Sequence, residues 1–312
     1  MKKVTVNFIL HERLDYFEKT LKQLININDN IKKDLGINLL VSNKNDNLKN
    51  YVNILNDNNI LTKAFLIRSG NNYMDKIYTA FVNSGEYIIS IDEDIFIPTN
   101  VWNYFIDNVN VLDKPENLFL SPIITTGIPS VDLFEDNFLE EEEKEQLHKF
   151  YLKTNIPNIW GADYSSLNEH TINSNEWKCE NFYNDVYKIN HHYKGVHPVR
   201  FSYEAQEYLN NICIKKINKI SSINNFSLKI LDRPYFCNSV FAVKKSDWEN
   251  IIHNQSLFRD SFDEVPLNLY MLNNKLKMVF IENGIAVHPS YNTINIYGHN
   301  YKNLSDSFFN GI

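Results

Sequence analysis

The chain has few cysteines, few glycines, no long apolar run and no excess of positive charge. Only 3 cysteines and 9 glycines occur among its 312 residues. The three scattered cysteines, Cys179, Cys213 and Cys237, exclude a disulfide framework and a cysteine zinc site, and reduced thiols predict a cytoplasmic protein. The formal net charge of −7 gives no general electrostatic reason to expect a nucleic acid or an anionic membrane as a partner.

The apolar segments are too short to predict a membrane span. The N-terminal run from Val4 to Leu10 is interrupted by Thr5 and Asn7, and charged residues follow it at once. This pattern predicts a first β-strand rather than a signal peptide. No apolar run approaches the roughly 20 residues that a membrane-spanning helix needs. With 43% hydrophobic and 22% charged residues, the chain is expected to be a soluble, globular protein with a substantial core.

Strands and helices are predicted to alternate through the first hundred residues. Buried apolar runs predict strands, and apolar residues at helical spacing, such as Leu14, Phe17, Leu21 and Leu24, predict helices. The expected strands cover residues 4–10, 37–41, 64–67, 87–91 and 118–122, and the expected helices cover 15–27, 48–55, 75–83 and 102–109. This order predicts an α/β fold with a mostly parallel sheet, in which a ligand binds beyond the carboxyl ends of the strands.

The alternation fades after about residue 125 and returns after about residue 230. The segment between them contains an acidic run, Glu140 to Glu145, which predicts a solvated helix face, and a helix is expected over residues 203–220. Regular elements are expected again at residues 236–243, 246–252, 265–274 and 277–281. We therefore expect one α/β domain that is interrupted by a long insertion.

The most informative motif is a strand that ends in carboxylates. A buried strand from Tyr87 to Ile91 is expected to lead directly into Asp92, Glu93 and Asp94. Side chains alternate along a strand, so Asp92 and Asp94 are expected on one face and Glu93, in a structural role, on the other. Two carboxylates at the end of a buried strand suit a hard divalent cation that carries a phosphate. The alternative is that these acids only cap the strand and the turn after it.

Four stretches together resemble the GT-A-fold nucleotide-sugar glycosyltransferases, and most closely their family-2-type inverting group. They are residues 11–24 (HERLDYFEKTLKQL), 83–94 (NSGEYIISIDED), 262–269 (FDEVPLNL) and 279–288 (VFIENGIAVH). The resemblance covers roughly the first 125 residues and residues 235–290. It rests on the order and spacing of the motifs rather than on any one of them.

The resemblance implies a metal-dependent, inverting transfer of a sugar from a nucleotide-diphosphate sugar, with a UDP-sugar as the expected donor. Asp92, Asp94 and His288 are the expected ligands of Mn²⁺ or Mg²⁺. Glu264 is the expected general base, and its neighbour Asp263 is the alternative. Residues 1–125 are expected to bind the nucleotide sugar, residues 126–230 to form the insertion, and residues 231–312 to form the acceptor and catalytic half with the C-terminal tail.

Donor-binding residues also follow from the resemblance. They are expected to be Arg13, Ser42, Asn43, Lys76 and Asp92. Ser42 departs from the family pattern, because the family usually has an Asp there, and Asn43 or Asp46 could take its place. Lys76 stands where the family has an Arg, so a point charge replaces a bidentate fork.

The insertion is the expected acceptor region, with His192, Tyr193 and Arg200 as its candidate binding residues. The acceptor could be a glycan, a lipid-linked sugar, a protein or a modified nucleobase. Two other functions stay open. One is a nucleotidyltransferase, although the loop over residues 10–15 lacks the glycines usual in that class. The other is a non-catalytic carbohydrate-binding protein on the same fold.

Overall fold

The computed structural model divides the chain into two compact units. The first consists of Met1–Pro122 and Ile223–Ala286, and the second of Ile123–Ser222 and Val287–Ile312. The structure describes residues 3–10, 13–41, 48–58, 60–67, 80–127, 130–154, 199, 202–231, 237–253, 264–290 and 300–312.

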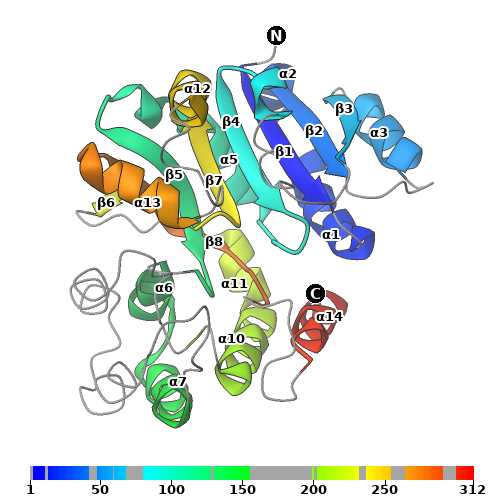
Figure 1. Cartoon of the computed structure of the whole chain (residues 1–312). Helices are drawn as coiled ribbons and strands as arrows, with labels where there is room; N and C mark the ends of the chain where they lie inside the picture. The colour runs from blue at the N-terminus through cyan, green and yellow to red at the C-terminus, as the bar shows by residue number, and fades with distance from the viewer. Residues whose placement is uncertain are drawn as a thin grey trace. The chain divides into compact units, whose positions relative to one another are not determined.

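The first unit is built on an eight-stranded mixed sheet with the strand order β3-β2-β1-β4-β7-β5-β8-β6. Its strands are β1 (Val4–Leu10), β2 (Leu35–Val41), β3 (Leu61–Leu66), β4 (Tyr87–Asp92), β5 (Asn117–Ile124), β6 (Ser227–Leu231), β7 (Val240–Lys244) and β8 (Lys277–Ala286). The first four strands pair in parallel, whereas β7 pairs antiparallel with both β4 and β5, and β6 pairs antiparallel with β8. Figure 1 shows β7 between β4 and β5.

Helices connect and cover these strands. They are α1 (Leu14–Ile25), α2 (Asp29–Asp34), α3 (Leu48–Asp57), α5 (Thr99–Asp107), α12 (Lys245–His253) and α13 (Glu264–Asn273), with the 3₁₀ turns η1 (Phe81–Asn83) and η2 (Val109–Asp113). Every residue of β1 and β2 is buried, as expected for parallel strands between layers of helices. The aromatic core includes Phe8, which packs edge-on against Phe17 with 4.9 Å between ring centroids.

Three buried polar side chains form a row of hydrogen bonds across the parallel half of the sheet. Asn38 Nδ2 donates to Asn7 Oδ1 at 2.9 Å, and Asn7 Nδ2 donates to Ser84 Oγ at 3.0 Å. Asn7 and Ser84 are fully buried, so these hydrogen bonds satisfy groups that water cannot reach. These hydrogen bonds connect β2 and β1 to the segment that leads into β4.

The second unit consists mainly of helices. They are α6 (Ser130–Phe138), α7 (Glu141–Lys153), α10 (Tyr203–Lys215), α11 (Ile217–Ser222) and α14 (Lys302–Gly311). Helix α10 contacts α7, α11 and α14. Helix α7 begins with a capping box, in which Glu140 accepts from the backbone of Glu143 and the Glu143 side chain accepts from the backbone of Glu140. Lys216 then binds Glu143 at 2.5 Å and lies over the ring of Phe138.

The α/β class predicted from the sequence is confirmed by this sheet and its helices. The strands expected from Val4 to Leu10 and from Tyr87 to Ile91 are β1 and β4, with β4 one residue longer. The helix expected over residues 203–220 is instead two helices, because α10 ends at Lys215 and α11 begins at Ile217. Most of the helix expected over residues 75–83 lies outside the described residues, and its end is the 3₁₀ turn η1.

Candidate functional site

The carboxyl ends of the parallel strands lie at one edge of the sheet. Leu10 pairs with Val41, Val41 pairs with Leu66, and Ile9 pairs with Asp92. Because these strands are parallel, the segments that follow β1, β2 and β4 all leave the sheet at this edge. The expected donor-binding residues Arg13, Ser42, Asn43 and Asp92 come from these segments or from the last position of the strand before them.

The carboxylate motif occupies the end of β4 and the turn after it. Asp92 is the last residue of β4, and its backbone N–H donates to the carbonyl oxygen of Ser239 at 3.0 Å. Glu93 and Asp94 form a turn, in which the N–H of Ile95 donates to the carbonyl oxygen of Asp92 at 3.4 Å. Because β4 ends at Asp92, strand alternation does not determine where the Asp94 side chain points. A common face for Asp92 and Asp94 therefore stays a prediction. The turn leaves Asp92 and Asp94 half-buried and Glu93 buried.

Arg13 stands at the start of α1, just beyond the end of β1. It is the N-cap residue of α1, and its guanidinium carbon lies 4.5 Å from the centroid of the Tyr16 ring. Arg13 Nη1 also donates to the hydroxyl of Tyr16, which is itself buried. This contact holds the guanidinium against the Tyr16 ring, at the start of the helix that follows β1.

Helix α13 begins at Glu264, the expected general base. Leu267 and Met271 on this helix are fully buried, which anchors the helix in the first unit. The backbone of Glu264 is described and its side chain is not, and Asp263 lies outside the described residues. The choice between Glu264 and Asp263 as base stays a prediction.

His288 belongs to the second unit, where two threonines surround it. Its backbone N–H donates to Thr125 Oγ1 at 3.1 Å, and its carbonyl oxygen accepts from Thr126 Oγ1 at 3.0 Å. The same Thr126 oxygen lies 3.1 Å from the ring nitrogen Nδ1. His288 is buried, with 6% of its surface exposed, and both threonines are buried as well. His288 is therefore buried and hydrogen-bonded to protein side chains, whereas a histidine at a solvated strand end would be hydrogen-bonded to water.

The expected metal ligands are divided between the two units. Asp92 and Asp94 belong to the first unit and His288 belongs to the second. Within the described part of the chain, no group of three or more His, Cys, Asp or Glu side chains converges on a metal position. The chemistry of the donors nevertheless fits Mn²⁺ or Mg²⁺, because half-buried carboxylates on a tight turn are hard oxygen ligands and an imidazole can complete a transition-metal site. Joint ligation of one cation by these residues stays a prediction.

Several expected site residues lie outside the described residues. These are Ser42, Asn43, Lys76, Asp263, His192, Tyr193 and Arg200. Their roles in donor binding, base catalysis and acceptor binding stay predictions.

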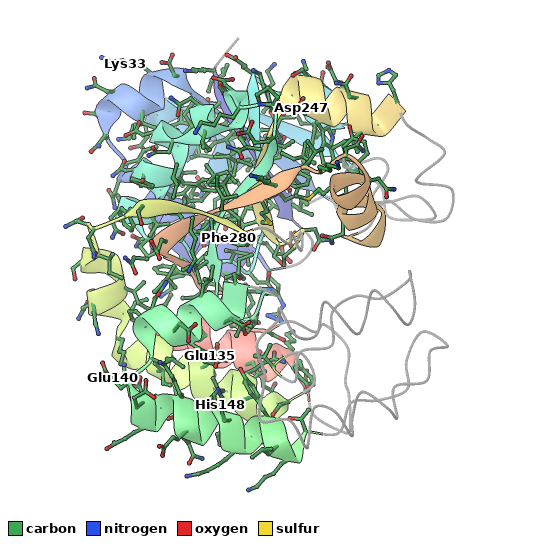
Figure 2. The ribbon with its side chains drawn as sticks, turned by 90° about the vertical axis from the view of Figure 1, so that its left-hand side faces the viewer. Lys33, Glu135, Glu140, His148, Asp247 and Phe280 are labelled. Carbon is green, nitrogen blue, oxygen red and sulfur yellow. The ribbon has the colours of Figure 1, made fainter. Side chains whose placement is uncertain are left out.

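The structure also reveals a buried glutamate with two hydrogen-bonding partners, which the sequence did not indicate. Glu135 on α6 accepts from the hydroxyl of Tyr151 at 2.8 Å and lies 2.9 Å from His148 Nε2. Both partners come from α7, and Figure 2 labels Glu135 and His148. Sequence spacing gives no signal for this cluster, because the acid and its partners lie on different helices.

No family model matches the chain, and no curated protein matches it. Among solved structures, the chain is similar to the mannosyltransferase PcManGT from Pyrobaculum calidifontis, bound to GDP-Man and Mn²⁺, with 15% identity and a TM-score of 0.33 over 42% of this chain. GalNAc-T7, bound to UDP, GalNAc and Mn²⁺, has 10% identity and a TM-score of 0.49 over 95% of this chain. A cytidylyltransferase from Leptospira borgpetersenii has 15% identity and a TM-score of 0.27 over 38% of this chain.

These likenesses are distant and partial. The matched regions span 37% of PcManGT, 44% of GalNAc-T7 and 53% of the cytidylyltransferase. At such TM-scores they carry no argument about function, and the α/β class rests on the sheet described above. Separately, none of the described helices combines the length and apolar character needed to cross a membrane.

Proposed function

We propose that this protein is a metal-dependent, inverting glycosyltransferase that moves a sugar from a UDP-sugar to an acceptor. The observation that carries the proposal is the position of Asp92. It ends β4 at the edge where the neighbouring parallel strands also end, and Asp94 follows it in a tight turn. Ligands of α/β sheets bind at this edge, and the residues there match the motifs that resemble the GT-A family.

The donor is proposed to bind across the segments that follow β1, β2 and β4. Arg13 and Lys76 would offset the charge of the diphosphate, and Ser42 and Asn43 would contact the nucleotide base. Asp92, Asp94 and His288 would hold Mn²⁺ or Mg²⁺. When bound, such a cation neutralises the negative charge that develops on the departing nucleoside diphosphate.

The transfer itself needs a base from the protein. Glu264 is proposed to accept the proton of the acceptor hydroxyl while that oxygen bonds to the anomeric carbon and the bond from this carbon to the diphosphate oxygen breaks. The products are the glycosylated acceptor, UDP and a protonated Glu264, which then returns its proton to water. Asp263, the preceding residue, is the alternative base.

The acceptor is proposed to bind residues 126–230, with His192, Tyr193 and Arg200 among its contacts, and residues 1–125 and 231–312 to supply the donor and catalytic halves. The acceptor class, whether glycan, lipid-linked sugar, protein or modified nucleobase, is part of the proposal to be tested. The two described cysteines, Cys213 and Cys237, are free thiols. Free thiols support the proposed cytoplasmic location.

Calorimetry with UDP and Mn²⁺ tests the metal site. Asp94→Ala should abolish Mn²⁺-dependent binding of UDP, and Asp92→Ala should weaken it less, because each removes a charged ligand. Asp34→Ala is the matched control, since Asp34 is an exposed acid that directly precedes β2 and so lies at the opposite edge of the parallel strands. Undiminished metal-dependent affinity in Asp94→Ala would show that the metal assignment is wrong.

Turnover assays test the base and the reaction class. Glu264→Gln should lower turnover by about 10²- to 10⁴-fold with little change in donor affinity, because it removes only the ability to accept a proton. If Asp263→Asn shows this loss instead, Asp263 is the base; if neither variant does, the inverting mechanism fails. Release of pyrophosphate from UTP and a sugar 1-phosphate would indicate a nucleotidyltransferase. UDP-sugar binding without any turnover would indicate a carbohydrate-binding protein.

Separate donor and acceptor assays test the insertion. Replacing His192, Tyr193 and Arg200 together with alanine should raise the KM for the acceptor and leave donor hydrolysis and UDP affinity near wild type. Equal losses in both assays would contradict an acceptor role for this region.

A further inference from the structure

Helix α1 is hydrogen-bonded to the chain where that chain leaves the carboxylate turn, which is formed by residues 92–95. We propose that Thr20 is a positioning residue, whose hydroxyl holds this turn in place so that Asp92 and Asp94 are set for a divalent cation. The inference deepens the proposed function and rests on it, because that function makes both aspartates metal ligands. Thr20 acts through the backbone of the turn and not on the reacting atoms.

Thr20 lies in the middle of α1, and only 1% of its surface is exposed. Its hydroxyl donates to the backbone carbonyl oxygen of Ile95, a residue that is fully buried. A carbonyl oxygen can only accept, so the direction of this hydrogen bond is fixed. Ile95 is also the residue whose N–H donates to the carbonyl oxygen of Asp92, at 3.4 Å. Thr20 therefore holds the same residue that closes the carboxylate turn.

The use of this hydroxyl is unusual for a threonine inside a helix. Such a threonine can donate to a carbonyl oxygen of the preceding turn of its own helix. The one hydrogen of the Thr20 hydroxyl instead joins α1 to a segment that lies 75 residues later in the sequence. The contact therefore serves the position of that segment rather than the helix itself.

A second contact joins α1 to the same stretch of chain. Gln23 follows Thr20 by three residues and so lies on the same face of α1. The N–H of Thr99, the first residue of α5, donates to Gln23 Oε1 at 3.3 Å, and the Thr99 hydroxyl lies 2.9 Å from the Gln23 carbonyl oxygen. Residues 95–98, which lead from the turn to α5, are all buried. This short buried segment is thus attached to α1 at both of its ends.

Helix α1 also begins next to an expected donor-binding residue, because Arg13 is its N-cap. One helix therefore connects the proposed diphosphate contact to the proposed metal ligands. Groups outside the coordination shell orient metal ligands, and their loss typically lowers metal affinity about 10- to 100-fold. Asp92 and Asp94 stand at the end of β4 and on the turn, so the backbone of the turn determines how far apart they lie. By holding that backbone, Thr20 sets the two carboxylates before the cation binds.

Amide hydrogen exchange of the metal-free protein tests the contact itself. Exchange at the Ile95 N–H reports opening of the turn, because this group makes the hydrogen bond that closes it. Thr20→Val keeps the shape of the side chain and removes the donor to a buried carbonyl oxygen. Exchange at Ile95 should then be roughly 5- to 150-fold faster, and Thr20→Ser, which keeps the hydroxyl, should retain slow exchange. An Ile95 amide that exchanges as slowly in Thr20→Val as in the wild type would overturn the proposal.

Thr62→Val is the matched control. Thr62 is also a buried threonine of the first unit, and its hydroxyl also donates to a backbone carbonyl oxygen, that of Ile60, at 2.9 Å. It lies near the start of β3, at the edge of the parallel strands opposite the turn, so exchange at Ile95 should stay close to the wild-type rate. Equal acceleration in both variants would indicate a general loss of stability and overturn the proposal. If Thr20→Val does not fold, Thr20→Ala and Thr20→Ser give the same comparison, since they differ only in the hydroxyl oxygen.

Calorimetry with Mn²⁺ in the presence of UDP tests the link to the metal. We expect about 10-fold weaker Mn²⁺ binding in Thr20→Val, recovery in Thr20→Ser and no change in Thr62→Val. Faster exchange at Ile95 with unchanged Mn²⁺ affinity overturns the metal role of Thr20 and leaves the proposed function intact. A wild-type protein that binds no Mn²⁺ overturns the metal part of the proposed function, and the exchange rates still decide whether Thr20 holds the turn.

Discussion

Removal of the Tyr151 hydroxyl should weaken the packing of α6 against α7 by a measurable amount. In the structure this hydroxyl donates to Glu135 Oε1 at 2.8 Å. Tyr151 is fully buried and Glu135 is 6% exposed, so water cannot replace the lost donor. A hydrogen bond to a charged group contributes about 1.5–3 kcal/mol, and we expect Tyr151→Phe to destabilise the two helices by that amount.

Native-state hydrogen exchange of the α6 and α7 amides is the appropriate assay, because it measures local opening without assuming that the whole chain unfolds as one unit. When the helices open and close much faster than the exposed amides exchange, a loss of 1.5–3 kcal/mol makes exchange roughly 10- to 150-fold faster. Tyr208→Phe is the matched control. Tyr208 packs on Phe150 with 5.6 Å between centroids, and no hydrogen bond from its hydroxyl to a described residue is found.

The same substitution made in a Glu135→Leu variant separates the contribution of the hydrogen bond from that of side-chain packing. In Glu135→Leu the acceptor is gone, so the further change Tyr151→Phe should cost close to nothing, since both polar partners are then absent. His148 remains in every variant, and its ring stacks on Tyr151 at 5.8 Å. The reasoning is refuted if Tyr151→Phe accelerates exchange no more than Tyr208→Phe does, or equally with and without Glu135.

Three further predictions concern other parts of the chain. Asn7→Leu should lower the free energy of unfolding of the first unit by roughly 1–3 kcal/mol for each partner left unsatisfied, since it strands Asn38 and Ser84 in the interior, and urea unfolding followed by tryptophan fluorescence measures the loss. Burial alone would raise the pKa of Glu143, but hydrogen bonds from Lys216 and from the Glu140 backbone lower it below its ordinary 4.5. The stability that this pairing adds is therefore present above pH 4.5 and is lost as the pH falls through the lower folded-state pKa, so urea midpoints of Glu143→Gln and wild type should differ at pH 7 and converge in acid, once the pH is below that lower pKa. Burial raises the pKa of the Cys213 thiol, and Cys237 is also buried, so a thiol reagent should modify at most Cys179 before urea is added.

The first unit was largely predictable because its signals are local. Strands such as β1 and β4 are short apolar runs, and helices such as α1 repeat apolar residues at helical spacing, so each element can be recognised within its own segment. The edge strand β6 was not predicted, because its apolar run is very short and part of it is exposed to solvent, as at Ile230. Helix α14 was not predicted either, although Leu304, Phe308 and Phe309 recur at helical spacing, because ten residues give only one repeat of that pattern.

The carboxylate motif shows where a local pattern stops being sufficient. The sequence correctly indicated a buried strand from Tyr87 to Ile91, because these five residues form a mostly apolar run, and β4 continues one residue further, to Asp92. Strand alternation does not extend to Asp94, because the turn begins at Glu93, so a common face for Asp92 and Asp94 stays a prediction. A strand end depends on the neighbouring segments, and here the backbone N–H of Asp92 donates to the carbonyl oxygen of Ser239, a residue far along the chain. Ligand geometry at such an end depends on the turn, which strand periodicity does not describe.

The environment of His288 was unpredictable for a related reason. The resemblance predicts a metal ligand at this histidine, but its buried contacts come from Thr125 and Thr126, which lie 163 and 162 residues earlier in the sequence. Neither threonine belongs to a recognisable motif, and each acquires its role only because β5 ends at Ile124, where Ser130 fixes the turn. Motif resemblance can identify residue types that suit a reaction. The contacts that position these residues join segments that only the folded chain brings together, so the surroundings of His288 are the part of the proposed site where the structure adds most to the sequence.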